Sequence, residues 1–135
     1  KPFHYIKNRF QDNEDGTISD FATGLMWQQS GSDDYMEFSQ AQTYIRSLNQ
    51  SRFTGHSDWR LPTIPELISL LEPEKNNKNR YIDPLFDNKQ LWCWSSDRIE
   101  GSSGAAWYVD FCYGSVYWSY FDDNGYVRGV RIQTM

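Results

Sequence analysis

The sequence predicts an α+β fold, and three observations indicate this class. Residues 10–28 alternate short apolar runs with turn dipeptides, as the strands of a β-meander do. Residues 38–73 change to helical spacing, and residues 90–132 return to strand-length runs. Strands, two helices, a long loop over 74–90 and further strands therefore follow one another, with no internal repeat.

The N-terminal strands are predicted from their turns. Asp15-Gly16 and Thr23-Gly24 are turn signals between the runs that contain "TIS" and "LMWQQ". Residues 1–9 have no clear period, and we interpret them as an arm or a first strand. The chain of 135 residues is expected to form one domain, residues 1–135.

Two helices are expected. Residues 38–50 place four residues at helical spacing, and Ser39 with Gln42 offers a capping box at the start. The four are Ala41, Tyr44, Ile45 and Leu48. The segment "RLPTIPELISLLEP" predicts the second helix, with Thr63 as N-cap, Glu66 three residues on and Pro73 as its stop.

The C-terminal part predicts four strands, in "LWCWSS", "AAWYVDFCY", "SVYWSYF" and "YVRGVRI". Gly114 predicts a tight turn, and Asn124-Gly125 is a strong hairpin signal between the last two runs. Alternation places Trp107, Val109 and Phe111 on one face, which we interpret as core.

Charge and length exclude several partners. The net charge is -5 without any basic run, so nucleic acid and anionic membranes are not expected. No stretch is apolar for long enough to span a membrane. No signal peptide opens the sequence, so if the protein is exported its leader precedes Lys1.

Candidate chemistry is weak throughout, and we expect no enzyme, cofactor or metal. His56, Ser57 and Asp58 are sequence neighbours, whereas a catalytic triad needs groups that converge in space. The segment 11–22 lacks the acidic ends of a calcium loop. Cys93 and Cys112 either form one bridge or remain two buried thiols.

The stretch "YGSVYWSYFDDNG" (113–125) is different, because no strand phase buries all its rings. If Val116 points inward, Trp118 and Tyr120 share its face, and Tyr117 lies on the other. Rings interleaved with Ser, Gly and Asp are typical of binding loops. We interpret the stretch as a binding surface; a two-sided buried sheet or an oligomer interface is the alternative.

Several segments resemble one family in their order and spacing. "DGTISDFATGLMWQ", "WRLPTIPELISLL", "YIDPLFD", "WCWSS", "AWYVDFCYG" and "YVRGVR" are similar to the Lcl C-terminal domain family of bacterial collagen-like adhesins. The resemblance implies a C-type-lectin-like fold. Such a fold has two helices, a small mixed or antiparallel β-sheet, and a ligand face on its C-terminal β-hairpins.

The family also resembles the variable proteins of diversity-generating retroelements. That resemblance implies a ligand site in which a constant scaffold is interleaved with exchangeable residues. The candidate ligand-binding residues are Arg98, Ser102, Ser103, Cys112, Tyr113, Ser115, Tyr117, Trp118, Ser119, Tyr120 and Asp122. The scaffold residues are Trp27, Trp59, Leu67, Trp94, Trp107 and Phe111.

The sequence thus predicts a non-catalytic recognition domain that binds a protein or a surface glycan. We expect it outside the cell, on a cell or virion surface, as a monomer or small homo-oligomer. The alternative is a structural, oligomerising module of a bacterial envelope adhesin, with carbohydrate binding as a variant of that role. The resemblance also implies sulfated glycosaminoglycans as ligands. These would need a basic face on the protein, which a net charge of -5 disfavours.

Overall fold

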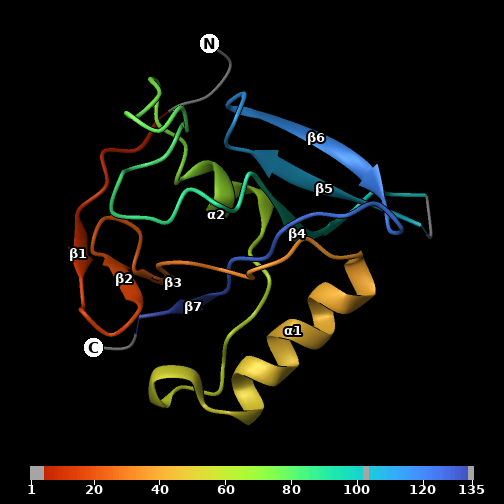
Figure 1. Cartoon of the computed structure of the whole chain (residues 1–135), viewed down its shortest axis with the longest axis horizontal. Coiled ribbons are helices and arrows are strands. Elements are labelled where there is room, and N and C mark those ends of the chain that lie inside the picture. Colours follow the sequence, from red (N-terminus) through yellow and green to blue (C-terminus); the bar gives the residue numbers. More distant parts are fainter. Residues whose placement is uncertain (1–4, 102–103, 134–135) are drawn as a thin grey trace.

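The structure, a computed structural model, describes residues 5–101 and 104–133 and contains two antiparallel sheets and two α-helices (Figure 1). The first sheet has the order β1-β2-β3-β7. Its strands are β1 (Phe10–Asp12), β2 (Thr17–Asp20), β3 (Leu25–Gln28) and β7 (Val130–Ile132). The predicted meander is confirmed, because β1, β2 and β3 pair in succession with antiparallel register.

Helix α1 (Phe38–Gln50) has the predicted bounds, but its cap differs from the prediction. The capping box is formed by Glu37 and Gln40, not by Ser39 and Gln42. The Phe38 N–H donates to the Phe121 carbonyl at 3.0 Å, so a contact distant in sequence fixes where the helix begins. A single 3₁₀ turn, η1 (Phe53–Gly55), follows.

Helix α2 (Ile64–Ile68) begins with the predicted Thr63–Glu66 capping box but is shorter than expected. It ends at Ile68 and not at Pro73, because the next N–H groups bond three residues back. Leu70 N–H donates to Leu67 O at 3.0 Å and Leu71 N–H to Ile68 O at 2.9 Å. This tighter winding brings Leu67, Leu70 and Leu71 into the core together.

The second sheet has the order β4-β5-β6. Its strands are β4 (Trp92–Arg98), β5 (Ala105–Asp110) and β6 (Ser115–Tyr120), and the register of β4 shifts between Trp94 and Arg98. The C-terminal strands predicted from the sequence are therefore confirmed, but they belong to two sheets and not to one. All named strand pairs are antiparallel.

The hairpin predicted at Asn124-Gly125 does not form. After β6 the chain leaves the second sheet, and β7 pairs with β3 in the first sheet instead. Gly125 exchanges backbone hydrogen bonds with Met36 in both directions, at 2.8 and 2.9 Å. A Cβ atom at Gly125 would lie only 2.4 Å from the Trp92 ring, so glycine serves close approach here, not a hairpin turn.

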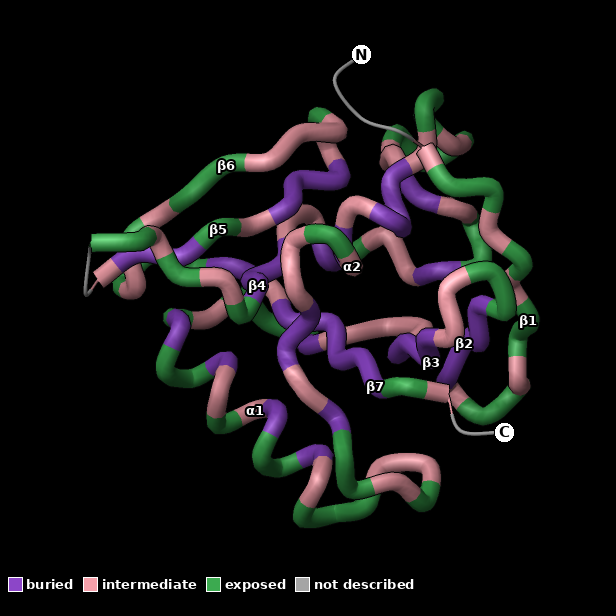
Figure 2. The backbone as a smooth tube through the Cα atoms, turned by 180° about the vertical axis from the view of Figure 1, so that it is seen from behind, coloured by how far each residue is buried: buried purple, intermediate pink, exposed green. Residues whose placement is uncertain are grey.

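Two hydrophobic clusters form the core, and together they join the two sheets to both helices. Figure 2 shows buried backbone through the centre of the molecule, whereas β6 is exposed or intermediate along its length. The scaffold residues predicted from the sequence are buried, with one exception. Trp107 is 37% exposed, although Val109 and Phe111 are buried as expected.

The exposure of Trp107 follows from the length of α2. The five residues of this helix extend about 7.5 Å. A helix of that length packs against Val109 and Val116 at one end of the second sheet and leaves the other end uncovered.

Candidate functional site

Strand pairing divides the rings of the second sheet between its two faces. Directly opposite residues of antiparallel strands project to the same side. Trp107 pairs with Trp118 and Ala105 with Tyr120, so Trp107, Trp118 and Tyr120 share one face, called here the groove face. Tyr108 pairs with both Trp94 and Tyr117, and these define the opposite face, called here the Tyr117 face.

The two helices cover opposite ends of these two faces. On the groove face, α2 packs over Cys93, Val109 and Val116. On the Tyr117 face, α1 packs over Trp94 and Ala106. Each face therefore keeps an uncovered aromatic end.

A hollow of about 390 Å³ lies on the groove face and is lined by Ile64, Asp97, Arg98, Trp107 and Val116. Its walls are mostly apolar, and its two charged residues are held in place. The Asp97 carboxylate accepts the Ile64 N–H at 2.7 Å. Arg98 stands opposite Ala106, and its guanidinium lies over the rings of Phe38 and Phe121, 5.4 and 5.3 Å from their centroids, so its charge is on the Tyr117 face. A cavity of this kind accepts an apolar group and offers one acidic side chain, that of Asp97.

Beside the hollow, Trp118 and Tyr120 form a perpendicular ring pair with centroids 5.2 Å apart. Their exposed fractions are 47% and 59%. Two large rings held edge to face present a rigid apolar surface together with one phenol hydroxyl. This pair is the most exposed aromatic contact on the groove face.

The Tyr117 face carries a row of rings. The centroids of Trp92 and Tyr108 lie 4.0 Å apart, and those of Tyr108 and Tyr117 lie 6.0 Å apart. Burial, with the nearby Asp110, raises the pKa of the Tyr108 hydroxyl above its ordinary value. The Tyr108 hydroxyl is thus a neutral hydrogen-bonding group at physiological pH.

The turn between β5 and β6 is fixed by Asp110. Its Oδ1 accepts the N–H groups of Cys112 at 2.7 Å and Tyr113 at 3.0 Å. Gly114 has a φ of 71°, and the Tyr81 ring packs against it. Tyr113 projects from this rigid turn with 72% of its surface exposed.

The structure distributes the predicted site residues over three places. Trp118 and Tyr120 lie on the groove face, with Asp122 exposed just after β6. Arg98 lines the hollow, but its guanidinium lies on the Tyr117 face. Tyr117, Ser115 and Ser119 lie on the opposite side of β6. Cys112 and Tyr113 lie at the turn, roughly 20 Å along the strand from Tyr120. Ser102 and Ser103 lie outside the described residues.

Sequence reasoning missed several residues of this region. Trp107 was assigned to the core, and Ile64, Asp97 and Val116 were not recognised as lining a hollow. Alternation alone could not reveal them, because which end of a strand is covered depends on the helix packed there. Asp123, which accepts a hydrogen bond from the Ser119 hydroxyl, is also absent from the candidate residues.

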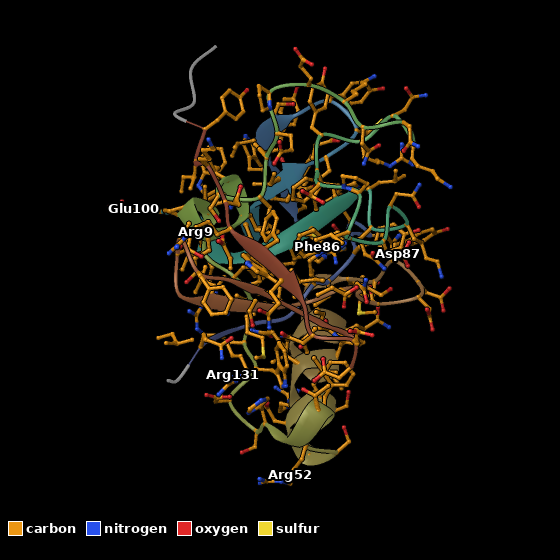
Figure 3. The ribbon with its side chains drawn as sticks, turned by 90° about the vertical axis from the view of Figure 1, so that its left-hand side faces the viewer. Arg9, Arg52, Phe86, Asp87, Glu100 and Arg131 are labelled. Carbon is orange, nitrogen blue, oxygen red and sulfur yellow. The ribbon has the colours of Figure 1, made fainter. Side chains whose placement is uncertain are left out.

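The residues weighed for catalysis have structural contacts. Asp58 pairs with Arg131, which Figure 3 labels, at 2.6 Å, and this hydrogen bond lowers the pKa of the Asp58 carboxyl. Arg60 binds Glu66 through two hydrogen bonds of 2.7 Å. Both cysteines are free thiols, and burial raises the pKa of Cys93 to about 11.

Residues 5–101 and 104–133 contain neither a metal-binding cluster nor a membrane-spanning helix. Within these ranges, no three His, Cys, Asp or Glu side chains gather closely enough to hold a metal ion. Within the same ranges, no helix combines the length and the apolar character needed to cross a membrane.

Comparison with known proteins relates the chain to one family. A search of curated proteins finds no match. Residues 16–131 match the Lcl C-terminal domain. The match begins at the turn before β2 and ends in β7, so it includes both helices, the second sheet with its groove face, and the first sheet except β1. The chain therefore belongs to the Lcl C-terminal domain family.

Proposed function

We propose that this domain is a non-catalytic recognition module that binds a ligand through the groove face of its second sheet. One observation carries the proposal. Three exposed rings, those of Trp107, Trp118 and Tyr120, lie at an apolar hollow on the paired strands β5 and β6. Large rings around a hollow supply buried area at low entropic cost, and such residues dominate binding energy at protein interfaces.

The chemistry of this surface favours a protein or a surface glycan as the ligand. Exposed rings stack on apolar side chains or on the apolar faces of sugars, and Asp97 can orient a polar group at the hollow. The acidic side chains after β6, Asp122 and Asp123, disfavour polyanions such as nucleic acid. Membership of an adhesin-associated family supports a location on an exported surface.

The proposal includes the fold relationship that the sequence suggested. Two helices, small antiparallel sheets and a C-terminal ligand face are features expected of a C-type-lectin-like domain. It also includes diversification of the site by a retroelement. Strand β6 supports this idea, because exposed Tyr and Trp and half-buried Ser side chains occupy it without contributing a fully buried residue. Exchange at such positions costs little stability.

Binding can be tested by paired alanine variants. Purified protein would be screened against arrayed extracellular proteins and surface glycans, and each hit compared with the double variant Trp118→Ala/Tyr120→Ala. We expect at least about a tenfold loss of affinity, since each ring is a candidate hot spot. Tyr35→Ala, which removes a 60% exposed ring elsewhere on the molecule, is the matched control and should bind normally.

Two results would refute the groove-face proposal. One is a ligand whose affinity is unchanged in the double variant but is lost when residues on another surface of the domain are substituted. The other is unfolding of the double variant, which would make these rings structural. Diversification has a separate test in the genomic DNA. A reverse transcriptase beside a near-copy of the 3′ end, with adenines at the codons for Tyr113 and residues 117–120, is the expected finding.

A further inference from the structure

The outer edge of β6 is open. This strand is the last in the order β4-β5-β6, and both views of the backbone show it at the rim of the molecule (Figures 1 and 2). Its six residues contain no charge and no proline. Proteins usually blunt an exposed edge with lysine, proline or a bulge, because unpaired backbone groups are a template for another strand. Strand β6 has none of these features.

Register identifies the backbone groups on this edge. Phe121 N–H donates to Gly104 O at 2.8 Å, which marks that pair as hydrogen-bonded across β5 and β6. Hydrogen-bonded and non-bonded pairs alternate along an antiparallel ladder. The backbone N–H and C=O groups of Val116, Trp118 and Tyr120 therefore point outward. Only the Tyr120 carbonyl has a described backbone partner, the Asp123 N–H at 3.0 Å.

We infer that two copies of this chain pair through these edges, with the two β6 strands antiparallel across a two-fold axis at Trp118. That register sets Val116 opposite the Tyr120 of the second copy, and Trp118 opposite its own counterpart. All three outward-pointing residues then form backbone pairs. A two-fold axis at Tyr117 would use only Val116 and Trp118, because Gly114 is in a turn with a φ of 71°.

Side-chain sizes fit this pairing. At each step away from the axis, a small residue of one copy lies opposite a large residue of the other. The pairs are Tyr117 with Ser119, Val116 with Tyr120, and Ser115 with Phe121. Cross-strand neighbours of this kind pack without collision. The pairing also leaves the Trp107 hollow uncovered, so the joined sheets would present two equal groove faces.

Charges fit it as well. The paired segment 115–121 contains no charged residue, and Asp122 and Asp123 of one copy come nearest the turn of the other copy, so no acid faces another acid. A cation, Lys75, lies near the end of the strand that receives Asp122, with its ammonium 5.7 Å from the ring centroid of Tyr81. Tyr81 packs on Gly114. Like charges directly opposite would oppose such a ladder, and this arrangement avoids them.

Sedimentation velocity on the purified chain tests whether it is a dimer in solution. We expect twice the monomer mass of 16.0 kDa at tens of micromolar protein. Trp118→Lys would set two ammonium groups face to face at the axis and give a monomer. Tyr35→Lys, which places the same charge on a ring 60% exposed elsewhere, should remain dimeric. A wild-type monomer at about 100 μM, or a dimer that persists in Trp118→Lys, would overturn the inference.

Disulfide trapping tests the register and does not depend on how Trp118→Lys folds. In a Cys112→Ser background, Trp118→Cys places two thiols on Cα atoms about 5.5 Å apart, within bonding range. Tyr120→Cys is the control, because its two copies are offset by four residues, roughly 14 Å. We expect at least about tenfold more covalent dimer from Trp118→Cys. Equal trapping at both positions would overturn the register.

Pairing and recognition fail separately in these experiments, because the dimer is measured without any ligand. If the wild-type chain is a monomer and the double variant Trp118→Ala/Tyr120→Ala no longer binds the ligands found on the arrays, the pairing is refuted and the recognition proposal stands.

Discussion

Replacing Arg128 by methionine would remove a guanidinium group that is 1% exposed, at the point where the C-terminal segment crosses β3. The group donates to five acceptors. They are the carbonyls of Gln28 at 2.9 Å, Gln29, Ser30 at 3.1 Å and Asp87 at 2.9 Å, and Gln90 Oε1 at 3.1 Å. It also lies 5.1 Å from the ring centroid of Phe86, which Figure 3 labels beside Asp87. One side chain thus ties β7 and its approach to β3 and to the 74–90 loop.

The size of the effect follows from these contacts. Methionine keeps most of the volume but leaves five acceptors without this donor. Each buried polar group left unpaired costs about 1–3 kcal/mol. Part of this cost is offset, because methionine is uncharged and the variant no longer carries the desolvation penalty of a buried guanidinium. We therefore expect a net loss of about 3–5 kcal/mol, a large share of the stability of an ordinary domain.

Urea denaturation followed by tryptophan fluorescence would measure this loss, since Trp27 and Trp94 are completely buried. Arg98→Met is the control, because Arg98 is exposed at the end of β4 and its ring contacts contribute about 1 kcal/mol. If Arg128→Met loses no more stability than Arg98→Met, the buried hydrogen bonds of Arg128 do not hold the C-terminal segment to β3 and the 74–90 loop.

Two further predictions concern titratable groups. A thiol reagent at pH 8 should label Cys112 and spare Cys93, because burial raises the Cys93 pKa to about 11; two equal labelling rates in the folded protein would contradict this. Burial favours a higher pKa for Glu66, but its bonds to Arg60 and Thr63 outweigh burial, and the net pKa lies below the ordinary 4.5. Its stabilising contribution is therefore complete above pH 4.5 and is lost as the pH falls through the lower folded value. Thermal unfolding should accordingly show the gap between wild type and Glu66→Gln narrowing from pH 7 to pH 3; a constant gap would contradict it.

Local chemistry was sufficient to predict most elements of the fold. The bounds of α1 followed from the spacing of Ala41 and Leu48, and the start of α2 from Thr63 and Glu66, because these signals act within one or two helical turns. The meander followed from its turn residues for the same reason. Contacts distant in sequence decided what differed. Phe38 bonds to Phe121, which sets the cap of α1, and Gly125 bonds to Met36, which prevents the expected hairpin.

The candidate site divides in the same way. By itself the sequence determined that the rings of β6 cannot all be buried, because side chains alternate strictly between the faces of a strand. Only the tertiary structure decided which rings lie together. A helix as short as α2 covers Val109 but not Trp107, and that difference opens the hollow beside Trp118 and Tyr120. Coverage of a sheet depends on where a distant helix ends, and no period within the strand records it.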